Sequence, residues 1–121
     1  MWLRDGVMTN PNFMNGIPEL VILRLLEKRE MYGYELVQAI RRETNNAISL
    51  GEGVVYPALH MLEHRRALKA RRKTVNGRTR IYYAVTKSGK KRLVGLTADW
   101  SRVTGAVSHV LSGDRHVLAN V

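Results

Sequence analysis

The stretch from Leu68 to Val85, LKARRKTVNGRTRIYYAV, has the pattern of two strands joined by a tight turn. Asn76 and Gly77 at its centre are the strongest short signal for a two-residue hairpin, because both tolerate the positive φ angles of a type I′ turn. Counting outward from this turn pairs Lys73 with Arg80. One face of the hairpin would then carry Leu68, Ala70, Ile81, Tyr83 and Val85, and the other Arg71, Lys73, Arg78, Arg80 and Tyr82.

Three amphipathic segments precede this hairpin. Residues 18–29 (PELVILRLLEKR) and residues 34–44 (YELVQAIRRET) repeat apolar side chains every three or four positions, as do residues 54–66 (VVYPALHMLEHRR). This spacing is typical of helices that bury one face. Three helices followed by a hairpin predict a mainly α fold with a small β-hairpin, the winged helix-turn-helix.

The positive charge is concentrated in and around the hairpin. The chain has 121 residues, a formal net charge of +10 and no cysteine, so we expect one small domain without disulfides or thiolate metal sites. Twelve Lys or Arg residues and no Asp or Glu occur from Arg65 to Arg92. This run has no acid of its own to relieve repulsion between pairs such as Lys73 and Arg80. We therefore expect phosphates of a nucleic acid to lie against the hairpin.

Residues 87–112 continue as one long helical pattern. Its apolar residues alternate at three- and four-residue intervals, which is typical of a seam that packs against another helix. A domain of this size has little core left to cover the seam, so we expect the same helix of a second chain there, in a two-fold homodimer. The predicted dimerisation residues are Leu93, Leu96, Trp100, Val103, Val107 and Val110.

These patterns divide the chain into three parts. We expect residues 1–15 to form an N-terminal arm, residues 16–86 the winged-helix domain, and residues 87–121 the C-terminal dimerisation helix and tail. No stretch approaches about 18 consecutive apolar residues, so we expect no membrane span and a cytoplasmic location. Nothing in the sequence calls for a cofactor.

The pentapeptide HMLEH, from His60 to His64, fits a pattern of zinc peptidases in which two imidazoles hold the metal and a carboxylate activates water. His60 and His64 lie one helical turn apart, which suits two ligands. A catalytic zinc also needs a third protein ligand, and His109 and His116 lie near the far end of the chain. A zinc peptidase using His60, Glu63 and His64 is therefore a remote alternative.

The chain resembles the PadR-type bacterial transcriptional regulators. The likeness runs from about Ile17 to Leu111 and is carried by ELVILRLLEKREMYGYEL, GVVYPALHMLE and NGRTRIYYAVTKSGKKRL. It implies double-stranded DNA as partner, with the third helix in the major groove, the wing at the neighbouring backbone or minor groove, and the last helix building the dimer.

The same resemblance implies that Tyr34 and Tyr56 approach the DNA backbone and that Gly77 marks the wing tip. Val54 departs from the family, which commonly has Thr or Ser there, and Glu52 lies nearby. Base contacts then depend more on methyl contacts, on His60 or on DNA shape. The candidate DNA-binding residues are Tyr34, Ser49, Val54, Tyr56, His60, Arg71, Lys73, Gly77, Arg78, Arg80 and Tyr82.

Trp100 has two interpretations. It is a seam residue, and it also belongs to DWSRV, residues 99–103, which looks like a stretch of the drug-responsive branch of the family. That likeness implies a planar aromatic ligand stacked on Trp100 at the dimer interface, with Asp99 balancing a positive charge. Val103, and Phe13 and Met14 of the arm, would line the same space.

The prediction is a homodimeric repressor that binds an inverted repeat and is relieved by a small aromatic ligand. One alternative is an architectural protein that coats nucleic acid with little sequence choice and no effector. A protein-interaction module is another, and it predicts little response of binding to salt.

Overall fold

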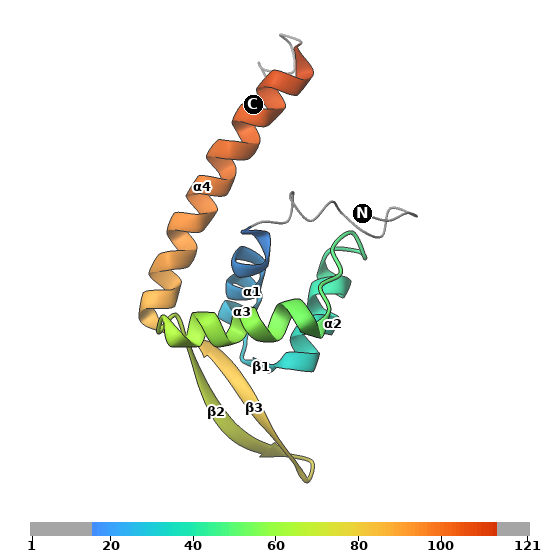
Figure 1. Ribbon diagram of the computed structural model, residues 1–121, viewed down its shortest axis with the longest axis vertical. Helices are drawn as coiled ribbons and strands as arrows, with labels where there is room; N and C mark the ends of the chain where they lie inside the picture. The colour runs from blue at the N-terminus through green and yellow to red at the C-terminus, as the bar shows by residue number, and fades with distance from the viewer. Residues whose placement is uncertain (1–15, 114–121) are drawn as a thin grey trace.

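The computed structural model of the protein describes residues 16–113 (Figure 1). Within that range, three short helices and a small sheet form the body, and a long last helix leads away from it. The predicted winged helix is confirmed. The elements are α1 (Ile17–Lys28), β1 (Met31–Tyr32), α2 (Gly33–Glu43), α3 (Glu52–His64), β2 (Leu68–Val75), β3 (Arg78–Val85) and α4 (Lys87–Ser112).

The core lies where α1, α2 and α3 meet the base of the hairpin. Most of the expected apolar stripes are buried there, with Leu20 and Val21 of α1 only partly covered. Truncating one of the large buried side chains costs about 2–5 kcal/mol because it leaves a cavity. Ile22 of α1 is among the fully buried residues. The fully buried side chains include Ile22, Leu23, Leu36, Ile40, Val55, Leu59, Leu62 and Leu68.

The hairpin has the predicted register. Leu68 pairs with Val85 and Lys73 with Arg80, and the turn between β2 and β3 has positive φ at Asn76 (54°) and Gly77 (78°), as a type I′ turn requires. The sequence interpretation missed β1, which pairs with β3 and makes a three-stranded sheet in the order β1-β3-β2. Two residues are too few for a periodic pattern to predict a strand.

The start of α2 is held close to α3. Glu35 accepts a hydrogen bond from the backbone N–H of Tyr32 (3.3 Å), and this capping box ends β1 and begins the helix. A Cβ on Gly33 would lie 2.4 Å from the ring of Tyr56, so only glycine fits here without displacing that ring. This close approach brings the N-terminus of α2 beside the tyrosine of α3.

The N-terminal end of α4 is bonded to the winged-helix body at several points. The Thr86 hydroxyl accepts a hydrogen bond from the Gly89 N–H (3.0 Å) and donates to the carbonyl oxygen of Arg66 (2.6 Å). Arg92 forms an ion pair with Glu19 of α1. The orientation of the last helix is therefore coupled to that of the winged helix.

Only part of the predicted seam of α4 is uncovered. Leu93 is buried and Leu96 packs against the core, so the winged-helix body of the same chain covers the first two seam positions. The expectation that the body has too little core to cover the seam was wrong for these two residues. Beyond them Trp100 and Val107 are about half exposed and Val110 is 78% exposed. The seam available to a second chain thus begins at Trp100.

None of the helices within residues 16–113 combines the length and hydropathy that crossing a membrane requires.

Candidate nucleic-acid interface

The exposed side of α3 carries the residues expected to meet DNA bases. Val55, Leu59 and Leu62 point into the core, which leaves the remaining faces of the helix to solvent. Val54 is 45% exposed and His60 is exposed. Both predicted contacts are therefore accessible to a groove of DNA.

A cleft of about 390 Å³ lies between α2, α3 and the wing. Its lining includes Tyr34, Tyr56, His60 and Arg80, so the structure brings together four predicted contacts from three elements. The Tyr56 and His60 rings lie 6.4 Å apart. Phenol hydroxyls, an imidazole and a guanidinium can all donate hydrogen bonds to a phosphate, which makes the cleft suitable for a DNA backbone.

Tyr83 determines which face of the wing lies toward α3. It is buried, and this burial raises the pKa of its hydroxyl, with a smaller contribution from nearby Glu63 of α3. Side chains alternate along a strand, so Ile81 shares this α3 side, as does its pairing partner Arg72 on β2. Arg71 and Lys73 lie on the opposite, far side of the wing.

On the far side, an acid relieves the repulsion that the sequence left unresolved. Glu30, between α1 and β1, accepts hydrogen bonds from Arg71 Nε (3.1 Å) and Nη2 (2.8 Å) and from Lys73 Nζ (2.5 Å). The run has no acid of its own, as the sequence shows, but Glu30 supplies relief from outside it. The sequence interpretation considered only acids within the run, and Glu30 comes from outside it.

Tyr82 does not present its ring as expected of a DNA contact. It is only 7% exposed, with Lys73 Nζ 4.5 Å above its ring and Tyr32 packed edge-on against it at 5.4 Å. Arg80 lies 4.4 Å above the Tyr32 ring. We call this arrangement the far-side cluster, made of Glu30, Tyr32, Arg71, Lys73, Arg80 and Tyr82.

The remaining predicted contacts are spread over the surface. Arg78 follows the turn and is exposed, so it is free to approach a phosphate together with the tip at Gly77. Ser49 lies in the connection between α2 and α3 and accepts a hydrogen bond from Arg41 (3.5 Å). The sequence interpretation missed Arg72, although the register alone places it beside Ile81 on the α3 side.

His60, Glu63 and His64 line a shallow depression on α3 together with Arg66. Within residues 16–113 no three His, Asp or Glu side chains are grouped so that they could hold a metal ion. A guanidinium beside two imidazoles is also an unfavourable neighbour for a cation. The geometry gives the zinc hypothesis no third ligand.

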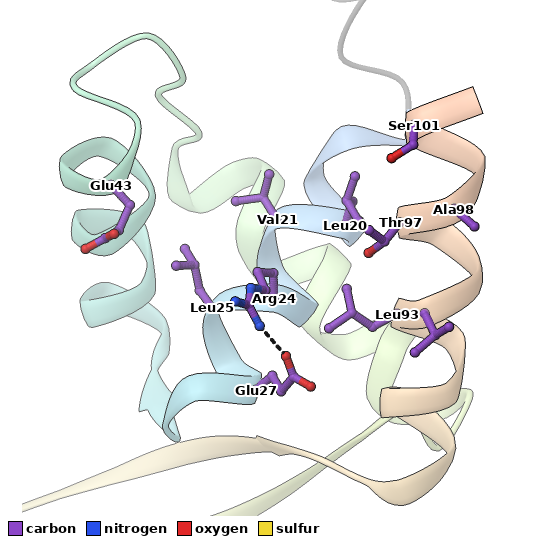
Figure 2. A pocket seen from close by; sticks show the side chains of 11 residues that line it. Leu20, Val21, Arg24, Leu25, Glu27, Glu43, Leu93, Thr97, Ala98 and Ser101 are labelled. Atoms are coloured by element: carbon purple, nitrogen blue, oxygen red, sulfur yellow. Dashed lines mark hydrogen bonds and ion pairs between the residues drawn. The ribbon is translucent and has the colours of Figure 1, made fainter. Parts of the chain in front are cut away.

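The predicted ligand residues of α4 lie in its C-terminal part, which the winged-helix body does not cover. Trp100 is 46% exposed, and Asp99 accepts a hydrogen bond from Arg102 (3.0 Å). Phe13 and Met14 lie outside the described residues. A separate groove of about 740 Å³ runs between α1 and α4, where Leu20, Leu93 and other side chains face one another (Figure 2). Trp100 does not line this groove.

Comparison with known proteins identifies the family. The model of the transcriptional regulator PadR-like family matches residues 22–94, which include α2, α3 and the wing. The chain belongs to this family. The resemblance seen in the sequence is thus confirmed.

Individual proteins are similar to this chain over most of its length. A protein of Lysinibacillus sphaericus named protein X is 31% identical over 107 residues, 88% of this chain and 98% of that protein. Transcriptional regulator YqjI of Escherichia coli is 33% identical over 90 residues, which are 74% of this chain and 42% of YqjI. The crystal structure of a PadR-like transcriptional regulator from Bacillus cereus matches with a TM-score of 0.74 at 27% identity, covering 85% of this chain and 99% of that one.

Membership of the PadR family decides between the broad functional classes. PadR proteins are DNA-binding transcription regulators and not enzymes, so the zinc peptidase is excluded and HMLEH is the C-terminal part of α3. The expected class of DNA-binding regulator is confirmed.

Proposed function

We propose that this PadR-family protein is a homodimeric repressor that binds an inverted-repeat operator and is released by a planar aromatic ligand. The observation that carries the proposal is the uncovered seam of α4, whose apolar side chains are 46% exposed at Trp100, 50% at Val103 and Val107, and 78% at Val110. A row of this length needs a partner, and a second copy of α4 is self-complementary under two-fold symmetry. The dimer would present two α3 helices to successive turns of one face of DNA.

In this proposal α3 enters the major groove and the wing approaches the adjacent backbone. Val54 offers an apolar contact to a thymine methyl group, and His60 a hydrogen bond to a base edge. Tyr34, Tyr56 and Arg80 donate to a phosphate held in the cleft between α2, α3 and the wing. Affinity then comes mainly from the backbone, and sequence choice from a few groups on α3.

The proposed ligand site lies on α4 at the dimer interface. A flat cation could stack on the exposed Trp100 ring, with the Asp99 carboxylate nearby and Val103 beside it. Such a ligand affects DNA binding only if it binds one arrangement of the two α3 helices better than another. Quenching of tryptophan fluorescence by planar cations, lost in Trp100→Leu but retained in Trp2→Leu, tests this site.

A salt titration of DNA binding tests the DNA-binding part of the proposal. The purified chain is titrated against its own upstream DNA and against a scrambled duplex of equal length. We expect a steep salt dependence on both and tighter binding to the upstream fragment. Equal binding to both would favour the architectural alternative, and binding that ignores salt would favour a protein-interaction module.

A further inference from the structure

Glu30 joins the helical body to the outermost strand of the sheet. It directly precedes β1, whereas its two partners, Arg71 and Lys73, lie on β2. In the sheet order β1-β3-β2, β3 lies between β1 and β2, so the Glu30 side chain passes over β3 to reach its partners on β2. This bridge links segments that no ladder hydrogen bond connects directly.

The bridge continues into a row of packed rings, while the Arg71 side chain itself stays 61% exposed. Lys73 contacts both Glu30 and the Tyr82 ring, and Tyr82 packs on Tyr32, which is itself covered by Arg80. Cations above aromatic faces are attracted by the ring quadrupole. Arg71 and Lys73 therefore already have a partner within the chain, whereas Arg80 also lines the cleft beside α3.

The electrostatics of Glu30 agree with this geometry. Hydrogen bonds from Arg71 and then Lys73 hold the pKa of the Glu30 carboxyl at about 2, well below its usual 4.5. The same contact raises the pKa of the Arg71 guanidinium. A phosphate that approached these two cations would compete with a carboxylate already bound to both.

Within residues 16–113, Arg72, unlike Arg71 and Lys73, has no acidic partner, and it lies on the α3 side of the wing. It is exposed, it pairs across the hairpin with Ile81, and Ile81 lines the cleft that also contains Tyr56 and His60. Among the ion pairs of residues 16–113, none involves Arg72. Its charge is available on the side of the wing that α3 shares.

We propose that Glu30 is a positioning residue that fixes the wing through Arg71 and Lys73, and that Arg72 makes the phosphate contact expected of those two cations. This inference rests on the proposed binding of DNA through α3 and the wing. It differs from the expectation drawn from the sequence, in which Arg71 and Lys73 themselves touched phosphates.

The salt dependence of DNA binding separates contact from positioning. Each phosphate contact that is lost should reduce the magnitude of the slope of log K against log salt by about 0.9. We expect that reduction for Arg72→Ala. For Arg71→Ala and Glu30→Gln we expect weaker binding with an unchanged slope, because both disturb the same bridge without removing a phosphate contact.

An exchange of charges provides the rescue. Glu30→Arg combined with Arg71→Glu keeps the net charge and rebuilds the ion pair with reversed polarity, and we expect this double variant to bind DNA more tightly than either single variant. A slope reduced by about 0.9 in Arg71→Ala would overturn the proposal, because Arg71 would then contact phosphate. Tighter binding by Glu30→Gln would also overturn it, since Glu30 would then be a competitor of DNA.

Amide hydrogen exchange tests the positioning role without DNA. Glu30→Gln should speed exchange in β2, whereas the control Glu27→Gln, which removes an exposed carboxylate paired with Arg24 on α1, should not. Unchanged exchange in β2 would refute positioning even in a chain that binds DNA normally. Absence of salt-dependent binding by the wild-type chain would instead refute the proposed function and the role of Arg72.

Discussion

At the scale of single residues, the wing depends on a carboxylate that lies outside its own sequence. Glu30 pairs with two cations that would otherwise repel their neighbours and offsets part of their charge, and its side chain is only 23% exposed. An exposed ion pair contributes little, but a bidentate arginine contact shared with a lysine is a network with fixed geometry. The same contact makes the wing sensitive to acid.

Glu30→Gln should alter the dependence of stability on pH. The folded pKa of Glu30 is about 2 against an ordinary 4.5, so ionised Glu30 stabilises the fold above about pH 4.5, and this contribution is lost as the pH falls toward 2. We expect the wild-type chain to have the higher urea midpoint at neutral pH, at equal protein concentration, and the two midpoints to converge in acid. A difference that stays constant over this pH range would contradict the assignment.

At the scale of elements, the junction between the hairpin and α4 leaves no room for a side chain on Gly89. A Cβ on Gly89 would lie 2.1 Å from the carbonyl oxygen of Ala67 and 2.8 Å from a methyl carbon of Val85. Backbone atoms cannot move aside as a flexible side chain can. The root of α4 therefore has one position relative to β2 and β3, which Thr86 and Arg92 reinforce.

Gly89→Ala should destabilise the protein although alanine favours helices. We expect a loss of about 1–3 kcal/mol in the free energy of unfolding, because α4 must shift away from the hairpin. Gly95→Ala is the matched control on the same helix: no atom lies within 4 Å of its new Cβ, and the substitution should stabilise by up to about 1 kcal/mol. Urea unfolding measures the stability of both variants against the wild-type chain. A Gly89→Ala variant as stable as the wild type would show that the junction tolerates a side chain.

The elements also show what sequence patterns can and cannot predict. The register of β2 and β3 was predictable because a two-residue turn fixes every pair, and α4 because its repeat is long. The strand β1 was not, since two residues carry no periodicity and its pairing with β3 depends on the finished core. Glu30 was missed with it, and so was the far-side position of Arg71 relative to α3.

At the scale of the whole molecule, two surfaces lie on different parts of one chain. In the proposed function, the winged helix presents α3 and the wing to DNA, and the exposed residues of α4 from Trp100 onward pack against a second copy. The junction at Gly89 and the ion pair of Arg92 with Glu19 connect them. A change in the angle between two α4 helices would therefore move the two α3 helices relative to each other.

Val107→Glu should separate the dimer. Val107 is 50% exposed in the single chain, and burying an unpaired carboxylate at the two-fold interface is costly. We expect a monomer in sedimentation at low micromolar concentration, and about 10²-fold weaker operator binding because the two sites no longer act together. Ser108→Glu adds the same charge at an exposed neighbouring position and should leave the dimer intact. A dimeric Val107→Glu would show that the partner helix packs elsewhere.

A hydroxyl-radical footprint of the wild-type protein on its upstream DNA tests the central claim most directly. A two-fold dimer with one α3 helix per chain predicts two protected half-sites in an inverted repeat, with centres about 34–36 Å apart or a multiple of that spacing. Protection of a single half-site, or coverage that grows in proportion to the length of the DNA, would contradict the proposal of a dimeric, sequence-specific repressor.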